Sequence, residues 1–219
     1  MFGFETFVIP TLATLISYSE CERKPPPRIT TQVDKKQISY DTSKTHQDLA
    51  NFNIDTISPY GSGVHTYVSG LMSGNINVSM SAKVGWSTNR MRNISCLWYD
   101  EINIEVTSSP VIYIAKEHKN DRCRYNATMR HEMKHVKMDN RILATYVPKF
   151  RYEVESMVRQ IGVVGPVRAD DVTKAREDMN SQIQQIIQRV MDEMKLERRT
   201  RQQEVDSRVE YDRMSNMCR

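Results

Sequence analysis

The chain has 219 residues, of which 39% are hydrophobic and 26% are charged, and its formal net charge is +4. This length accommodates one ordinary hydrophobic core, alone or with an appended segment, and argues against two full domains. No apolar run reaches the roughly 18 residues that a membrane-spanning helix requires, so we expect no transmembrane segment. Basic runs such as residues 195–201 are interspersed with glutamates. This mixture argues against nucleic acid as a partner, because such a partner needs a basic face.

Residues 1–27 are predicted to be a signal-like segment followed by a proline-rich linker. Residues 7–16 are an apolar run of the length found in secretion signals, and the three prolines at 25–27 favour a stiff, extended linker. Glu5 stands where such a signal usually carries positive charge, and the alternative is a short apolar strand or a disordered tail. We expect a secreted or periplasmic protein, and the sequence leaves open whether this N-terminus is complete.

The first part of the folded domain, residues 28–125, is predicted to be rich in strands. Residues 75–84 alternate apolar and polar side chains, which is the period of a half-buried strand. Residues 97–106 alternate in the same way, and Pro110 opens a short strand of high β propensity at 111–115. We also expect a short helix and two turns, at residues 44–52, 61–63 and 73–75.

Residues 126–219 show the periodicity of helices. Apolar residues follow steps of three or four through much of 129–161, and Asn126 or Thr128 could cap the start of this helix. Pro148 lies inside the apolar stripe and either ends one helix or kinks a longer one. Because the stripe continues past the proline, we favour a kink in one long helix.

A turn at residues 162–166 leads to a second amphipathic helix that begins near residue 172, and the two helices would pack as an antiparallel hairpin. The predicted fold class is therefore α+β, with a mostly antiparallel N-terminal sheet followed by a long antiparallel helical hairpin. Residues 28–219 would form this single domain.

The first long helix contains His131-Glu132-Met133-Lys134-His135, the pattern H-E-x-x-H. Residues four apart lie on one face of a helix, so His131 and His135 can bind the same Zn²⁺ ion. Glu132 is rotated by about 100° from His131, which lets it act on a water molecule rather than on the metal. The metal would acidify this water, and Glu132 would take its proton and pass it to a leaving amine.

A catalytic zinc site normally needs a third protein ligand, and three carboxylates are candidates. Glu210 is the first choice, because a helical hairpin would bring the C-terminal segment over the histidines; Asp206 and Glu155 are the alternatives. Tyr211 is a candidate donor to the oxyanion of a tetrahedral intermediate. Asp139 lies too far along the helix to share the ion, and is either an outer partner of a histidine or a solvated carboxylate.

The motif is similar to the signature of the zincin metallopeptidases. The layout of residues 38–212 also resembles, remotely, an uncharacterised family of secreted bacterial proteins assigned as zinc-dependent proteases. Tyr40, Thr45 and Leu49 echo an early element of that family, with one residue fewer between the tyrosine and the threonine. In the family's closing element, Tyr211 stands where the final histidine would be. The resemblance implies a zinc peptidase whose third ligand comes from a different residue.

We therefore predict a zinc-dependent peptidase whose peptide or protein substrate lies along an edge strand of the sheet. The alternative is a non-enzymatic envelope or partner-binding protein, in which the hairpin presents an interaction surface and the histidines bind a structural zinc ion or none. Neither the substrate preference nor the oligomeric state can be read from the sequence.

The chain has four cysteines and no C-x-x-C pair. If the protein is exported, we expect one disulfide among Cys96, Cys123 and Cys218, which leaves one of the three thiols over. The sequence does not indicate which two residues pair.

Overall fold

The computed structural model describes residues 21–22, 24–52, 57–60 and 67–218. The signal-like run at residues 7–16 and the turn expected at 61–63 lie outside the described residues. The described chain combines helices and strands with an open sheet and a long helix, so the α+β class is confirmed.

The sheet is built around one strand, β4 (Ile94–Ile114). The similarly long β3 (Gly70–Asn89) pairs with it antiparallel on one side. On the other side β5 (Val164–Arg168) pairs antiparallel, and β1 (Arg28–Lys35) and β2 (Ser39–Asp41) pair parallel. The sheet predicted to be mostly antiparallel therefore contains two parallel pairings, and each of the other described strands is hydrogen-bonded to β4.

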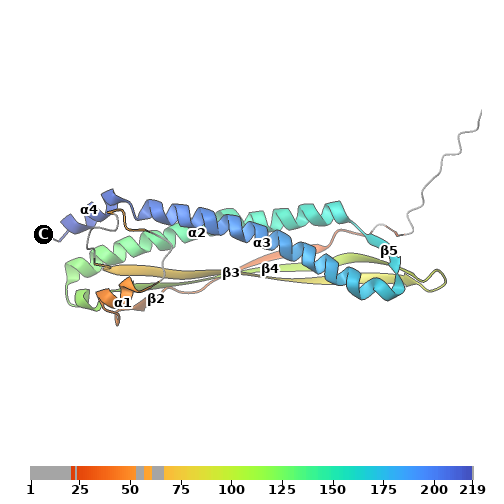
Figure 1. The fold of residues 1–219 in the computed structure, drawn as a ribbon, viewed down its shortest axis with the longest axis horizontal. Helices are drawn as coiled ribbons and strands as arrows, with labels where there is room; N and C mark the ends of the chain where they lie inside the picture. Colours follow the sequence, from red (N-terminus) through yellow and green to blue (C-terminus); the bar gives the residue numbers. More distant parts are fainter. Residues whose placement is uncertain (1–20, 23, 53–56, 61–66, 219) are drawn as a thin grey trace, which may run out of the picture.

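The helical hairpin consists of α2 (Arg122–Ile161) and α3 (Val172–Val205). Figure 1 shows that the two helices run antiparallel and lie on one face of an elongated sheet. Pro148 lies inside α2, so the prediction that one long helix continues past it is confirmed. A short helix, α1 (His46–Ala50), lies within the predicted range 44–52.

The ends of α2 follow from local hydrogen bonding. The helix begins after Asp121, whose side chain accepts a hydrogen bond from the backbone N–H of Arg124 at 3.0 Å. The predicted caps at Asn126 and Thr128 are therefore wrong, because the helix starts more than a turn earlier. Its last residue is followed by Gly162, whose φ of 62° suits a residue without a side chain. This glycine opens the predicted turn, but part of that segment belongs to β5.

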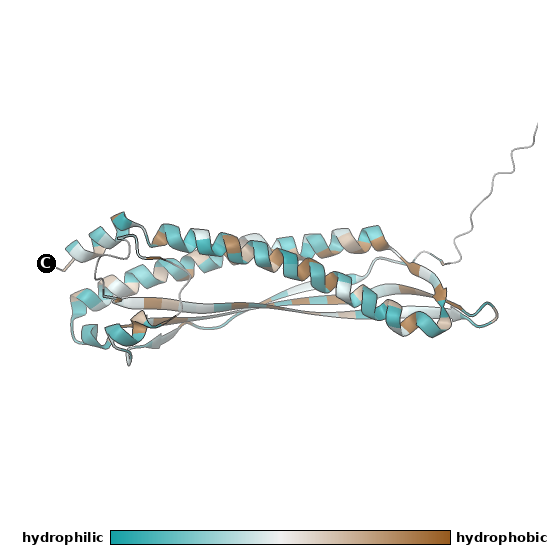
Figure 2. Ribbon diagram, in the orientation of Figure 1, coloured by the Kyte–Doolittle hydropathy of each residue, from teal (hydrophilic) through white to brown (hydrophobic). Residues whose placement is uncertain are grey.

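The hydrophobic core lies between the sheet and the hairpin. Alternate residues of β4 point towards the helices, as the period of a strand requires. The fully buried members of this core include Leu97, Ile102, Val106, Phe150, Val154, Ile183 and Val190. The last helix, α4 (Arg208–Asn216), has no buried residue and is mainly hydrophilic (Figure 2). It is therefore held against the protein by polar contacts and a covalent bond.

Two predicted strands, 97–106 and 111–115, are one strand. Pro110 lies inside β4 rather than opening a strand, and β1 and β2 leave a gap beside it, between the partners of Ser108 and Val111. The predicted turn at residues 73–75 is wrong as well, because β3 runs through it and pairs Gly74 with Pro110. β1 and β2 pair with β4 before and after Pro110 but not beside it. Because proline has no N–H to donate, this gap allows it to lie inside the strand.

All four cysteines form disulfides, Cys21 with Cys96 and Cys123 with Cys218. The expectation that one of Cys96, Cys123 and Cys218 would stay unpaired is wrong, because Cys21 pairs with Cys96. Cys21 lies in the stretch predicted to be a signal and linker. Cys21 lies against Gly165 of β5, and Cys218 comes just after α4, which are at opposite ends of the molecule in Figure 1. Two disulfides are compatible with an oxidising compartment. Among the described helices, none is both long enough and apolar enough to cross a lipid bilayer.

Candidate metal centre

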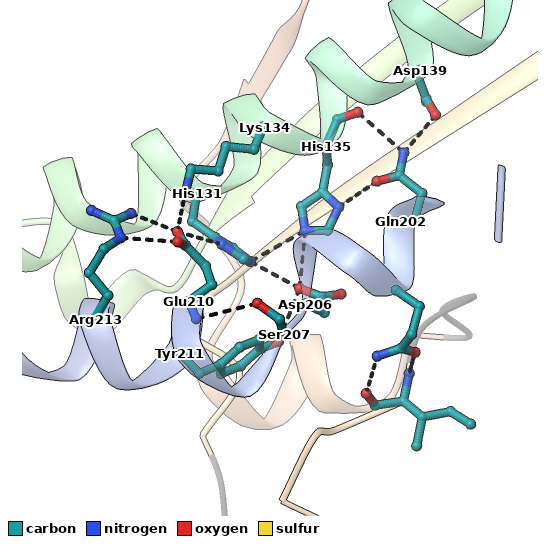
Figure 3. Close-up of polar contacts among 12 residues, drawn as sticks. His131, Lys134, His135, Asp139, Gln202, Asp206, Ser207, Glu210, Tyr211 and Arg213 are labelled. Atoms are coloured by element: carbon teal, nitrogen blue, oxygen red, sulfur yellow. Dashed lines mark hydrogen bonds and ion pairs between the residues drawn. The ribbon is translucent and has the colours of Figure 1, made fainter. Parts of the chain in front are cut away.

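His131 and His135 lie one turn apart on the buried face of α2, where α3 gives way to α4 (Figure 3). The two rings pack edge to face with centroids 4.9 Å apart. Their Nε2 atoms approach to 3.3 Å. The rings are therefore directed towards a common point, as the i, i+4 spacing predicted.

Asp206 completes this group. It follows the last residue of α3, and Ser207 then caps the start of α4, so the carboxylate lies at the junction of two helices. Its Oδ1 atom is 3.1 Å from Nε2 of His131 and 3.2 Å from Nε2 of His135. All three residues are buried, and within the described part of the chain they form the group of His, Cys, Asp or Glu side chains that could hold a metal ion.

The spacing of these three atoms fits one face of a zinc tetrahedron. Zinc binds histidine nitrogen and carboxylate oxygen at about 2.0–2.2 Å, and a regular tetrahedron of that radius has edges of about 3.3–3.6 Å. Of the three observed separations, 3.3 Å reaches the lower limit of this range, and 3.1 and 3.2 Å fall slightly below it. Small outward movements would centre an ion among the donors, and two nitrogens with one carboxylate oxygen are a donor set that zinc accepts.

Glu210, the first choice for third ligand, lies on the other side of His131. Its Oε1 atom is 3.5 Å from Nδ1 of that ring, whereas Asp206 faces Nε2. Arg213 and Lys134 bind the Glu210 carboxylate at 2.6 Å each and lower its pKa to about 2, against the effect of burial. The structure thus brings Asp206, the second choice, to the two histidines, and leaves Glu210 beside Nδ1 of His131, a buried atom that makes no hydrogen bond to any described residue.

Glu155 and Tyr211 occupy different surroundings from those predicted. Glu155 lies about 30 Å beyond His135 along the same helix, where it pairs with Arg151 and Arg159. It is therefore not brought to the site. Tyr211 is brought to the site, and its hydroxyl donates a hydrogen bond to Oδ1 of Asp206 at 3.3 Å. Burial, followed by the charge of Asp206, raises the pKa of Tyr211 well above its usual range.

Glu132 is buried between α2 and the start of β3. It is 3% exposed, and the backbone of Met72 donates a hydrogen bond to its carboxylate. A methyl group added at Gly70 would lie 2.8 Å from Glu132 Oε1, so the glycine leaves the space that this carboxylate needs. Burial raises the pKa of Glu132 to about 7, while the nearby His131 and His135 act in the opposite direction.

A hydrogen-bonded chain behind His135 was missed by the sequence analysis. Nδ1 of His135 lies 2.6 Å from Oε1 of Gln202, whose Nε2 donates to the backbone oxygen of His135 at 3.2 Å and to Oδ1 of Asp139 at 2.7 Å. Arg198 then binds both oxygens of Asp139, at 2.7 and 3.0 Å, and donates to the carbonyl of Gly74 at 3.2 Å. Asp139 is thus an outer partner of the histidine through Gln202. The spacing of Gln202 and Asp206, four residues apart, was the available signal.

The pKa of His135 responds to these partners. Burial alone lowers it, but the hydrogen bond and charge of Asp206, with smaller contributions from Glu132 and Gln202, together outweigh burial, and the pKa is raised overall.

Comparisons with models of protein families, with curated proteins and with solved structures each found no match.

Proposed function

We propose that the protein is a zinc-dependent peptidase in which His131, His135 and Asp206 hold the ion and Glu132 is the general base. The observation that carries the proposal is the triangle of two Nε2 atoms and one carboxylate oxygen, with sides of 3.1–3.3 Å. The resemblance of H-E-x-x-H to the zincin signature supports the same assignment.

The chemistry divides between the ion and the chain. A zinc ion at this position would supply a Lewis acid that acidifies water and polarises a peptide carbonyl. Glu132 would accept a proton from water and transfer it to the departing amine. The space at Gly70 and the backbone N–H of Met72 orient this carboxylate. In the described state the Tyr211 hydroxyl orients Asp206, and the oxyanion role of Tyr211 stays a prediction.

We place this activity outside the cytoplasm. Two disulfides join all four cysteines, and such bonds persist in oxidising compartments. A secreted or periplasmic location agrees with a peptidase that meets peptide or protein substrates there.

The test combines metal content with hydrolysis. Protein loaded with zinc and freed of excess metal is analysed by mass spectrometry, and digestion of casein is followed in parallel. We expect His135→Ala and Asp206→Ala to lose the bound zinc, and Glu155→Gln, the control for a rejected ligand, to keep it. Glu132→Gln should retain zinc and lose hydrolysis, because an amide cannot accept the proton. Wild-type protein that binds no zinc would refute the metal centre.

A structural zinc site is a second candidate, favoured by burial. His131, His135, Asp206 and Glu132 are each less than 10% exposed, and closed sites are typical of structural zinc. In that case zinc would raise the thermal unfolding temperature while wild type and Glu132→Gln both leave casein intact. The hairpin would then serve a non-enzymatic envelope or partner-binding role, as the alternative from the sequence describes.

A further inference from the structure

Only one of the two flipped orientations of the Gln202 side-chain amide satisfies the hydrogen-bonding groups around it. One end of the amide faces the backbone oxygen of His135 and Oδ1 of Asp139, at 3.2 and 2.7 Å. The backbone oxygen can only accept hydrogen bonds, and Oδ1 of Asp139 also accepts one from Arg198. The NH₂ group must therefore occupy this end, because the opposite orientation would place three acceptor oxygens together.

The orientation of the amide determines which ring nitrogen of His135 carries hydrogen. Oε1 of Gln202 is then the atom that lies 2.6 Å from Nδ1 of His135, and an amide oxygen only accepts. Nδ1 must donate. In a neutral imidazole the other nitrogen, Nε2, consequently has a free lone pair, and this is the atom that faces His131 and Asp206.

We propose that Gln202 is a positioning residue that holds neutral His135 in its Nδ1–H form and thereby directs the Nε2 lone pair at the metal. The inference rests on the proposed metal centre, but the hydrogen position can be tested without any metal. Ligating histidines commonly donate their second N–H to an outer partner, which orients the ring and fixes its tautomer. Here that partner is an uncharged amide.

The amide is itself fixed from behind. Gln202 and Asp139 are 3% and 4% exposed, so water has little access to compete for these hydrogen bonds. Arg198 binds Asp139 through two nitrogens and is anchored on the Gly74 carbonyl of β3. Rotation of the Gln202 amide would break its hydrogen bonds to His135 and Asp139 of α2, whereas the ring of an isolated histidine is free to choose either tautomer.

The first experiment observes the tautomer in metal-free protein. Long-range ¹H–¹⁵N NMR of the histidine rings, recorded at about pH 9 so that the rings are neutral, distinguishes Nδ1–H from Nε2–H. We expect wild-type His135 to be Nδ1–H and Gln202→Leu to lose this preference. Gln188→Leu, the same change on an exposed part of α3, should behave as wild type.

The second experiment measures zinc affinity by competition with a chromophoric chelator. Loss of an outer partner commonly weakens metal binding by about 10–100-fold, and we expect this for Gln202→Leu and no change in Gln188→Leu.

Two outcomes would overturn the inference. The first is an Nε2–H ring at His135 in the wild type, which can be seen even if Gln202→Leu fails to fold. The second is a folded Gln202→Leu protein that keeps both the Nδ1–H form and wild-type zinc affinity. A wild type that is Nδ1–H but binds no zinc would refute the proposed function and the metal-directed part of this inference, leaving the tautomer assignment standing.

Discussion

Gly70 makes room for the motif helix at the first residue of β3. A methyl group at this position would lie 2.3 Å from Cγ2 of Thr128 and 2.8 Å from Oε1 of Glu132. Thr128 and Glu132 are 2% and 3% exposed, so neither side chain can move into solvent. The close approach of β3 to α2 therefore depends on the absence of a side chain.

We expect Gly70→Ala to lower the free energy of unfolding by about 1–3 kcal/mol, the usual cost of overpacking. Gly74→Ala is the matched control on the same strand, because its nearest contacts would be 3.3–3.6 Å. Thermal unfolding of both variants measures the difference. Equal stability of the two variants would contradict the close packing of Gly70 on α2.

The proposed third ligand, Asp206, was the least predictable residue of the site. The spacing of His131 and His135 is local and was sufficient to predict that they share a face. The choice between Asp206 and Glu210 depends on where α3 ends. The spacing of apolar residues does not reveal the short break between α3 and α4 at residues 206–207. Gln202 was missed because an uncharged amide is not a usual ligand, although it lies one turn before Asp206.

At the scale of the elements, Tyr99 joins the sheet to the hairpin. It is a buried residue of β4 and its hydroxyl donates to the backbone oxygen of Met179 in α3 at 2.8 Å. Burial raises the pKa of Tyr99 to about 12, from an ordinary value of 10.0. Tyr146 has a pKa raised to about 12 as well, by burial and then by a hydrogen bond to Glu197.

These shifts predict a loss of stability in alkali. Between about pH 10 and pH 12 the unfolded chain loses its phenol protons, while folded Tyr99 keeps its own. The contribution of Tyr99 to stability is therefore complete below this window, and the free energy of unfolding falls as the pH rises through it. Tyr99→Phe should make the decline shallower, and should cost about 1 kcal/mol at neutral pH through the lost hydrogen bond. Urea unfolding from pH 8 to 12 measures both effects. Tyr152→Phe, on the exposed side of α2, is the control for loss of a hydroxyl. An unchanged slope in Tyr99→Phe would contradict the assignment.

The elements differ in how well their sequences predicted them. The helical hairpin was predictable because its apolar period extends on both sides of Pro148. The sequence predicted two strands in place of β4 because proline is disfavoured inside strands. Pro110 is tolerated there because β1 and β2, which are far from it in the sequence, leave a gap beside it. The parallel pairing of β1 and β2 depends on contacts far apart in sequence, which a local period cannot reveal.

At the scale of the molecule, the Cys123–Cys218 disulfide ties the end of the chain to the start of α2. The helix before Cys218, α4, has no buried residue, so this bond and a few polar contacts keep it beside the proposed metal centre. The other disulfide, Cys21–Cys96, lies against Gly165 of β5, and Figure 1 shows β5 at the opposite end of the molecule from α4.

Removal of either disulfide should destabilise the protein, but only one should affect the metal. We expect replacement of Cys123 and Cys218 by serine to speed the release of bound zinc to a chelator. Replacement of Cys21 and Cys96 by serine should leave that rate unchanged. Each pair should lower the free energy of unfolding by about 2–5 kcal/mol, as expected for disulfides. Equal release rates in the two double variants would show that α4 does not cover the site.

The central position of β4 in the sheet also determines when the strands can pair during translation. Three strands, β1, β2 and β3, leave the ribosome before their common partner, so none of the pairings described for this sheet can form until β4 begins to emerge at Ile94. Ribosome-stalled chains that end within β3 should be digested rapidly by added protease, and resistance should appear only once β4 is outside the exit tunnel. Until β4 emerges, β1, β2 and β3 expose unpaired strand edges that are open to association with other chains.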